Sequence, residues 1–276
     1  MASKLHRALS KIRSLRIIDQ RRLPALPERM HLRKLLDYLD VDCVFDVGAN
    51  AGQYAIMLRR HAGFRGQIIS FEPAPEVAAL LQDKARHDKR WEVHACALAD
   101  VAGVRSFNIM ANSEFSSLSA PSESETSLFA DLNRKISAVS VNVETLDGIF
   151  RELQARHGFR RPFLKMDTQG FDLSVLRGAR GCISQFVGLQ SELAIRKIYS
   201  EATDFRDALT FYEELGFTLS ALVPNNGGHF PALVEMDCIM ARRDLMEPAL
   251  LAHPKPLRVN SPPPQKQRTA TESPTA

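Results

Sequence analysis

The sequence predicts an α/β domain of alternating strands and helices, and three observations support this prediction. The first is a strand, a glycine turn and a helix over residues 44–58. The second is a similar strand, turn and helix that begins at Pro162. The third is an acidic residue at the end of several apolar runs. Because the carboxyl ends of parallel strands meet at one edge of a sheet, these acids predict a single site at that edge.

Length and composition agree with this class. The chain has 276 residues, of which 45% are hydrophobic and 25% are charged, as is ordinary for a globular protein. We expect one domain of about 200 to 250 residues. No run reaches the about 18 apolar residues of a membrane span, and the basic N-terminus lacks the apolar segment of a secretory signal. A cytoplasmic location is therefore expected.

The net charge of +4 is unevenly distributed along the chain. Residues 1–34 carry +8, so the remainder carries −4. A mildly acidic body does not indicate nucleic-acid binding. Residues 1–30 form a basic arm or helix that suits peripheral contact with an anionic membrane surface or a partner. A solvated helix that caps the domain is an equally good interpretation.

The α/β domain is expected over residues 31–246, followed by a tail. Seven of the fifteen prolines lie in the last 29 residues, which indicates disorder over residues 247–276. The cysteines are widely spaced and form no C-x-x-C motif, so we expect buried free thiols and no metal site. They are Cys43, Cys96, Cys182 and Cys238.

The turn between Asp46 and Gly52 is the strongest local signal. Gly48 provides backbone freedom, and Gly52 is expected to let backbone and ligand approach closely. Asn50 is expected to cap the next helix, with Gln53 completing a capping box. Asn50 and Gln53 also stand where a dinucleotide motif has its second and third glycines, which disfavours a nucleotide-linked oxidoreductase. A turn that joins strand and helix without any ligand is the alternative.

Apolar or alternating runs predict the strands. The second strand is expected at residues 67–71, ending at Glu72, and the third at residues 91–98. Glu72 can accept hydrogen bonds from ribose hydroxyls, or it can complement the dipole of the next helix. The remaining strands are expected at 104–109, 138–143, 162–166, within 186–193, 217–223 and 233–241.

Apolar residues three and four positions apart predict the helices. One helix, residues 31–39, leads into the first strand, and Gly63 is expected to end the helix of the glycine turn. The next helix is expected to carry Leu80 and Leu81 on its apolar face. Thr145 can cap a further helix. Two more helices are expected after residue 170 and over 205–215.

Two polar segments lie near the predicted edge. Residues 112–133 are rich in serine and form a loop that is either mobile or a lid over the site. Residues 224–228 form the turn between the last two strands, and His229 follows them. His229 is a candidate to reach a molecule bound in the site. The commoner interpretation is that it is an exposed histidine in a loop.

Four segments in this order resemble the FkbM-type family of S-adenosylmethionine (SAM)-dependent methyltransferases. They are residues 46–52 (DVGANAG), 71–73 (FEP), 97–100 (ALAD) and 164–170 (LKMDTQG) with 175–179 (VLRGA). The resemblance covers roughly residues 41–242. The family often has Val-Glu-Gly after the aspartate of the last segment, whereas this chain has Thr168-Gln169-Gly170. A role for a glutamate at that position is therefore not available.

The resemblance implies a class I methyltransferase (Rossmann-like) fold. Its sheet has seven mostly parallel strands with an antiparallel last strand, and helices cover both faces. The resemblance also implies SAM as cofactor and O-methylation of a hydroxyl on a saccharide or small-molecule acceptor. A non-catalytic binding or scaffold protein that uses the basic arm is the alternative. Methylation of nucleic acid ranks lower, because the body is acidic and no N/D-P-P-Y-like motif follows the strand at residues 162–166.

Eight residues are expected to bind the cofactor. The resemblance places the methionine part at Asp46 and the glycine turn, and the ribose at Glu72. Adenine would lie against Ala97 or Leu98, and Asp100 would receive its amino group. The full set is Asp46, Gly48, Asn50, Gly52, Glu72, Ala97, Leu98 and Asp100.

Three residues are candidates for the chemistry of methyl transfer. An alcohol acceptor must lose a proton, so a base near the methyl group helps. Asp167 is the first candidate for this base or for orienting the acceptor, and Glu192 and His229 are weaker ones. A structural alternative for Asp167 is capping of the turn that follows it. No dense group of ligands indicates a metal.

Overall fold

A computed structural model describes residues 25–111, 113, 116–118, 134–196, 203–224 and 231–246. Residues 1–24 and 247–276, most of the serine-rich loop, and His229 lie outside the described residues. The helices are α2 (Leu26–Tyr38), α3 (Gln53–Met57) with a π-helical extension (Leu58–Ala62), α4 (Pro75–Ala85), α6 (Leu146–His157), α7 (Asp172–Arg177) and α8 (Phe205–Glu214), and a 3-10 turn spans Ile183–Gln185. The strands are β1 (Cys43–Val47), β2 (Gln67–Phe71), β3 (Trp91–His94), β4 (Ala97–Leu98), β5 (Gly103–Met110), β6 (Lys135–Glu144), β7 (Pro162–Met166), β8 (Gly188–Ala194), β9 (Phe217–Pro224) and β10 (Glu235–Arg242).

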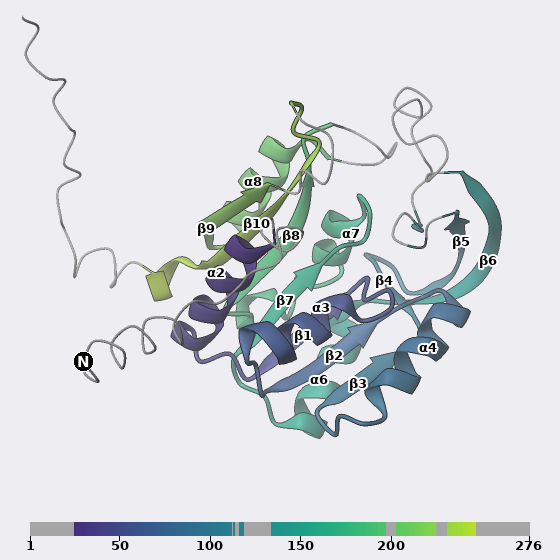
Figure 1. Cartoon of the computed structure of the whole chain (residues 1–276), viewed down its shortest axis with the longest axis horizontal. Helices are drawn as coiled ribbons and strands as arrows, with labels where there is room; N and C mark the ends of the chain where they lie inside the picture. The colour runs from purple at the N-terminus through teal and green to yellow at the C-terminus, as the bar shows by residue number, and fades with distance from the viewer. Residues whose placement is uncertain are drawn as a thin grey trace, which may run out of the picture.

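The main sheet has seven strands in the order β3-β2-β1-β7-β8-β10-β9 (Figure 1). Strands β3, β2, β1, β7 and β8 pair in parallel, and β10 runs antiparallel to both β8 and β9. The predicted sheet with an antiparallel last strand is confirmed. The strand order reverses between β1 and β7, which is where ligands bind in open α/β sheets.

Helices cover both faces of this sheet because its central strands are apolar on both sides. On one face, Phe45 and Val47 of β1 pack in a core with residues of α6, α7 and α8. On the other face, Val44 packs with residues of α2 and α3. Alternate β1 side chains thus enter opposite cores, as the period of a strand requires.

A second, three-stranded sheet corrects the predicted third strand. Residues 91–98 do not form one strand, because the chain leaves the main sheet after His94. β4 instead pairs in parallel with β6, which pairs antiparallel with β5. The β5–β6 hairpin extends from the main body beyond α4 (Figure 1).

Several predictions about helix ends and helix faces can be compared with the structure at single residues. Thr145 caps α6, accepting from the backbone nitrogen of Gly148 at 3.1 Å, and Gly63 ends the π-helical extension with a φ of 74°, so both predictions are confirmed. The prediction for α4 is wrong at Leu80, whose exposed fraction is 61%, because this helix buries Leu81 together with smaller alanines. α2 begins at Leu26, inside the predicted N-terminal arm.

The four cysteines are free and buried, as predicted. Within the described residues, none of the helices combines the length and apolar character that crossing a membrane requires.

Candidate functional site

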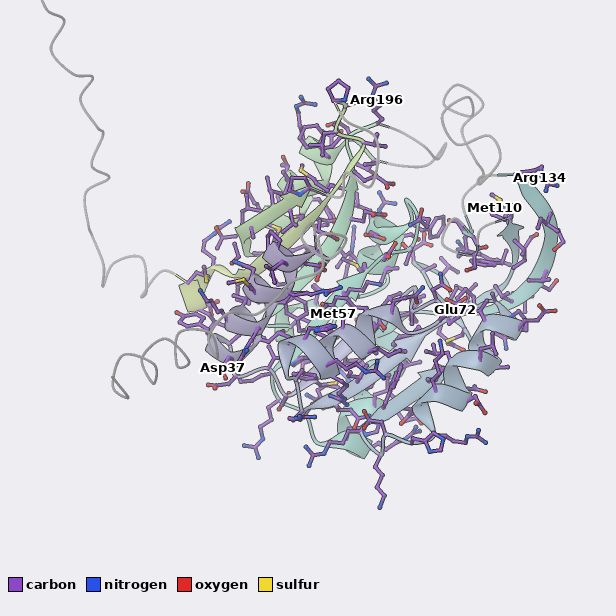
Figure 2. The ribbon with its side chains drawn as sticks, viewed as in Figure 1. Asp37, Met57, Glu72, Met110, Arg134 and Arg196 are labelled. Carbon is purple, nitrogen blue, oxygen red and sulfur yellow. The ribbon has the colours of Figure 1, made fainter. Side chains whose placement is uncertain are left out.

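A cavity of about 720 Å³ lies at the carboxyl ends of β1, β2, β7 and β8. Glu72, at the tip of β2, contributes to it and lies on the side of the sheet toward the β5–β6 hairpin (Figure 2). One part of the lining contains Gly48, Asn50, Glu72, Ala97 and Leu98. Another part contains Glu28, Asp167, Glu192, Glu235 and Asp237.

Gly48 lets the first turn pass directly against the end of β7. Its φ is 74°, and an added Cβ would lie 1.9 Å from the carbonyl oxygen of Asp167. The backbone nitrogens of Gly48 and Ala49 both donate to the carbonyl oxygen of Phe71, at 3.1 and 3.0 Å. The turn therefore depends on a residue without a side chain, for its conformation and for its packing.

The structure corrects the capping that was predicted for this turn. The N-cap of α3 is Gly52, without a side-chain hydrogen bond, whereas Asn50 lies in the turn with a φ of 45°. Gly52 does not line the cavity. An added Cβ there would meet Leu81 at 2.7 Å and Trp91 at 2.9 Å, so Gly52 serves the packing of α4 and β3 against the turn.

Glu72 is fixed by backbone donors and faces the cavity. Its Oε2 accepts from the backbone nitrogen of Asn50 at 2.8 Å, and its Oε1 accepts from that of Ala74 at 2.9 Å. Its exposed fraction is 6%. Burial raises the pKa of Glu72, while the two backbone hydrogen bonds oppose this shift. Each carboxylate oxygen can accept a further hydrogen bond from a ligand.

The apolar wall beside Glu72 comes from the chain that crosses between the two sheets. Ala97 and Leu98 line the cavity, together with Cys96. Asp100 does not line it. Its carboxylate instead accepts from Ser174 at 2.9 Å and pairs with Arg105 at 3.2 Å, and the Ser174 hydrogen bond lowers its pKa. The predicted contact of Asp100 with adenine thus lacks support in its position.

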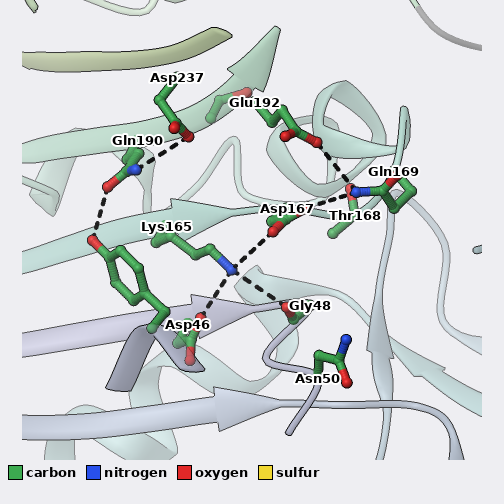
Figure 3. A network of polar contacts seen from close by, with 12 residues as sticks. Asp46, Gly48, Asn50, Lys165, Asp167, Thr168, Gln169, Gln190, Glu192 and Asp237 are labelled. Carbon is green, nitrogen blue, oxygen red and sulfur yellow. Dashed lines mark hydrogen bonds and ion pairs between the residues drawn. The ribbon is translucent and has the colours of Figure 1, made fainter. Parts of the chain in front are cut away.

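Asp46 is wholly buried and does not line the cavity. Its Oδ1 lies 3.2 Å from Nζ of Lys165, and its Oδ2 accepts from the Ser70 hydroxyl at 3.2 Å. Figure 3 shows Lys165 between Asp46, Gly48 and Asp167. Burial alone would lower the pKa of Lys165, but Asp46 and Asp167 raise it above its usual range. The cation that pairs with Asp46 is therefore the side chain of Lys165, and not a group of a bound ligand.

Asp167 and Glu192, both predicted candidates, are brought together by one amide (Figure 3). Gln169 Nε2 donates to Oδ1 of Asp167 at 2.8 Å and to Oε2 of Glu192 at 3.2 Å. The carboxylate that receives the backbone nitrogen of Thr168 is that of Asp172, at 3.0 Å. Asp172 therefore performs the capping role considered for Asp167.

A second glutamine links two further acids. Gln190 Nε2 donates to Glu28 at 2.9 Å and to Asp237 at 3.3 Å, and its Oε1 accepts from the Tyr54 hydroxyl at 2.9 Å. Burial, followed by the charge of Glu28, raises the pKa of Asp237 to about 7. Burial, followed by the charge of Asp167, raises the pKa of Glu235 to about 7.

Sequence reasoning assigned no role to Lys165, Gln190 or Glu28. Lys165 had a visible signal, since a charged residue inside a five-residue apolar strand requires a buried partner. Glu28 had none, because only the packing of α2 brings it to strands that follow much later in the chain. Among the described residues, no three His, Cys, Asp or Glu side chains are arranged to hold a metal ion.

Comparison with known proteins gives two sequence matches. The model of the methyltransferase FkbM domain matches residues 46–219, which is more than half of the chain. The 31-O-demethyl-FK506 methyltransferase FkbM of Streptomyces tacrolimicus is 42% identical over 80 residues, or 28% of this chain. That match spans 30% of the length of the Streptomyces protein.

Solved structures give more distant similarities. Cofactor-bound Rv0187 from MTB has a TM-score of 0.46 and 15% sequence identity. The match covers 88% of this chain and 89% of the Rv0187 chain. Magnesium protoporphyrin IX methyltransferase (ChlM) from Synechocystis PCC 6803, with bound SAM, has a TM-score of 0.42 and 9% identity, covering 83% and 86%. Neither TM-score reaches 0.5, so the match to the family model is the informative comparison.

Proposed function

The chain belongs to the methyltransferase FkbM family, and on that premise we propose that it is a SAM-dependent O-methyltransferase. Its acceptor is a hydroxyl of a sugar, a glycan or another small molecule. A cytoplasmic location and a contact of the N-terminal arm with a membrane surface stay predictions from the sequence.

Several features of the cavity support SAM as its ligand. Its volume of about 720 Å³ lies within the usual range of about 300–1,000 Å³ for cofactor sites. At Gly48 the cofactor would meet bare backbone, because a Cβ there would collide with the Asp167 carbonyl. Glu72 would offer its carboxylate oxygens to the ribose. Ala97 and Leu98 would form an apolar wall against adenine. When bound, SAM supplies a methyl group already activated on a sulfonium.

One observation supports the proposal most strongly. The cavity lined by Glu72 and the glycine turn is also lined by Asp167 and Glu192, which the Gln169 amide holds together. In the proposed reaction, Asp167 would accept the proton of the acceptor hydroxyl as the hydroxyl oxygen takes the methyl group from the sulfonium, which would leave as a neutral thioether. Gln169 fixes the direction of the Asp167 carboxylate by donating to Oδ1. The proton would go to Oδ2, which lies 3.6 Å from the Lys165 ammonium and is not hydrogen-bonded to it.

A methyl-transfer assay tests this proposal. Labelled SAM is incubated with the full chain and a panel of sugars and small alcohols, and an amine series runs in parallel. Asp167→Asn is expected to lower turnover by about 100-fold or more, while the affinity for S-adenosylhomocysteine (SAH) changes less than threefold. The exposed Asp207→Asn is the control. Transfer to amines alone, or full turnover by Asp167→Asn, would contradict the proposal.

A further inference from the structure

We propose that Lys165 is a positioning residue, which holds the glycine turn in the conformation that binds the cofactor. This inference rests on the proposed function, because it concerns the same cavity. Lys165 itself is one of the residues that line it.

The ammonium of Lys165 contacts three separate parts of the site. Its Nζ lies 3.2 Å from Oδ1 of Asp46 on β1, 3.3 Å from the carbonyl oxygen of Gly48, and 3.6 Å from Oδ2 of Asp167 (Figure 3). An ammonium has three donors and no acceptor. The contact with the Gly48 carbonyl is a hydrogen bond, and the contacts with Asp46 and Asp167 are ion pairs. The three partners belong to β1, to the turn after it and to the end of β7.

Neutralising a buried charge does not fully account for these contacts. The side chain of Lys165 is 8% exposed and that of Asp46 is 0% exposed, and moving such a pair out of water has a large desolvation cost. Two neutral side chains of similar size are often equally stable in such a place. The contact with the Gly48 carbonyl is different in kind, because it fixes backbone that lines the cavity.

Other contacts hold the rest of the turn, including the one from Lys84 to the Ala51 carbonyl, and Lys165 holds the carbonyl of Gly48. Gly48, Asn50 and Gly52 have positive φ values of 74°, 45° and 83°, a conformation that costs energy at a non-glycine residue. The turn must also present the Asn50 backbone nitrogen to Glu72 at 2.8 Å. If the Gly48 carbonyl lost Lys165, the turn would keep its hydrogen bonds to Phe71 but lose its hydrogen bond from β7. We expect the cofactor site to loosen in that case.

A double variant separates positioning from neutralisation of charge. Lys165→Met alone leaves Asp46 buried without its cation and is expected to lower the melting temperature strongly. Lys165→Met combined with Asp46→Asn removes both charges and is expected to regain most of that loss. Calorimetric titration of the full-length protein with SAH should still show binding at least tenfold weaker than in the parent.

A charge-preserving variant tests the same point with a cation still beside Asp46. Lys165→Arg keeps a cation beside Asp46, but its planar fork cannot direct three donors as an ammonium does. We expect a melting temperature near that of the parent and SAH binding at least fivefold weaker. The matched control is Lys84→Met, because the exposed Lys84 donates to the carbonyl of Ala51 in the same turn at 2.7 Å. Its SAH affinity should stay within twofold.

Two results would overturn the inference. A folded double variant, or a folded Lys165→Arg, that binds SAH as tightly as the parent would show that Lys165 only balances Asp46. A parent that does not bind SAH would instead refute the proposed function, and this inference with it. The parent titration therefore distinguishes the two failures.

Discussion

At the scale of single residues, buried carboxylates in this site differ in the kind of donor that holds them. Asp46 has an ammonium and the Ser70 hydroxyl, and Glu72 has two backbone nitrogens. Asp237 has an amide that it shares with Glu28. An amide orients a carboxylate without neutralising it, which is consistent with a pKa of about 7 for Asp237. These differences give each acid a separate experimental signature.

The pH dependence of stability should report Asp237. Its folded pKa of about 7 lies above the about 3.9 of an unfolded aspartate, so the folded state binds the proton more tightly. The free energy of unfolding should therefore fall as pH rises from about 4 to about 7. Asp237→Asn should reduce this fall in urea unfolding series at several pH values. An unchanged slope would contradict the assignment, and the exposed Glu76→Gln is the control.

Replacement of Gly48 by alanine should destabilise the fold more than replacement of Gly63. Both glycines have a φ of 74°, but an added Cβ meets the Asp167 carbonyl at Gly48 and nothing within 4 Å at Gly63. Gly63→Ala should cost about 1–2 kcal/mol from conformation alone. Gly48→Ala should cost clearly more in urea unfolding, and equal costs for the two variants would refute the packing argument.

At the scale of elements, local sequence patterns predict a strand well when the residues of that strand alone determine where it begins and ends. Residues 67–71 and 162–166 match β2 and β7 in full, because a continuous apolar run fits a strand buried on both faces. Residues 91–98 look equally apolar. These residues divide into β3 and β4 because β4 pairs with β6, a strand that follows much later in the chain. Local sequence does not contain this partner.

The central strand β8 supplies a donor whose loss should be costly. Gln190→Leu would leave Tyr54 without its acceptor and would place Glu28 and Asp237 near each other without the shared donor. Unsatisfied buried groups of this kind cost about 1–3 kcal/mol each. The free energy of unfolding should fall by at least that amount, whereas the exposed Gln185→Leu should change it little. A neutral Gln190→Leu would argue against this network.

The N-cap of α6 gives a test of stability that should leave the cavity intact. Thr145→Ala removes the hydrogen bond to the Gly148 nitrogen, which should lower the free energy of unfolding by about 1 kcal/mol. Because Thr145 is not among the residues lining the cavity, SAH affinity should stay within twofold. Thr145→Ser, which keeps the hydroxyl, should restore most of the stability.

At the scale of the whole molecule, some residues that line the cavity lie inside the segment matched by the family model, and others lie outside it. The glycine turn, Glu72 and Asp167 lie within residues 46–219, whereas Glu28 and Asp237 lie outside them. The motifs in the sequence therefore predicted residues that line the end of the cavity around Glu72. The acids at the other end are far apart in the chain, and only the topology of the sheet and the packing of α2 bring them together.

The central claim is that this cavity binds SAM, and calorimetric titration of the full-length protein with SAH tests it most directly. We expect micromolar binding, weakened at least tenfold, or about 1.4 kcal/mol, by Glu72→Ala. Unfolding curves would show that the variant is folded. No binding to a folded parent, or equal binding by a folded Glu72→Ala, would contradict the claim.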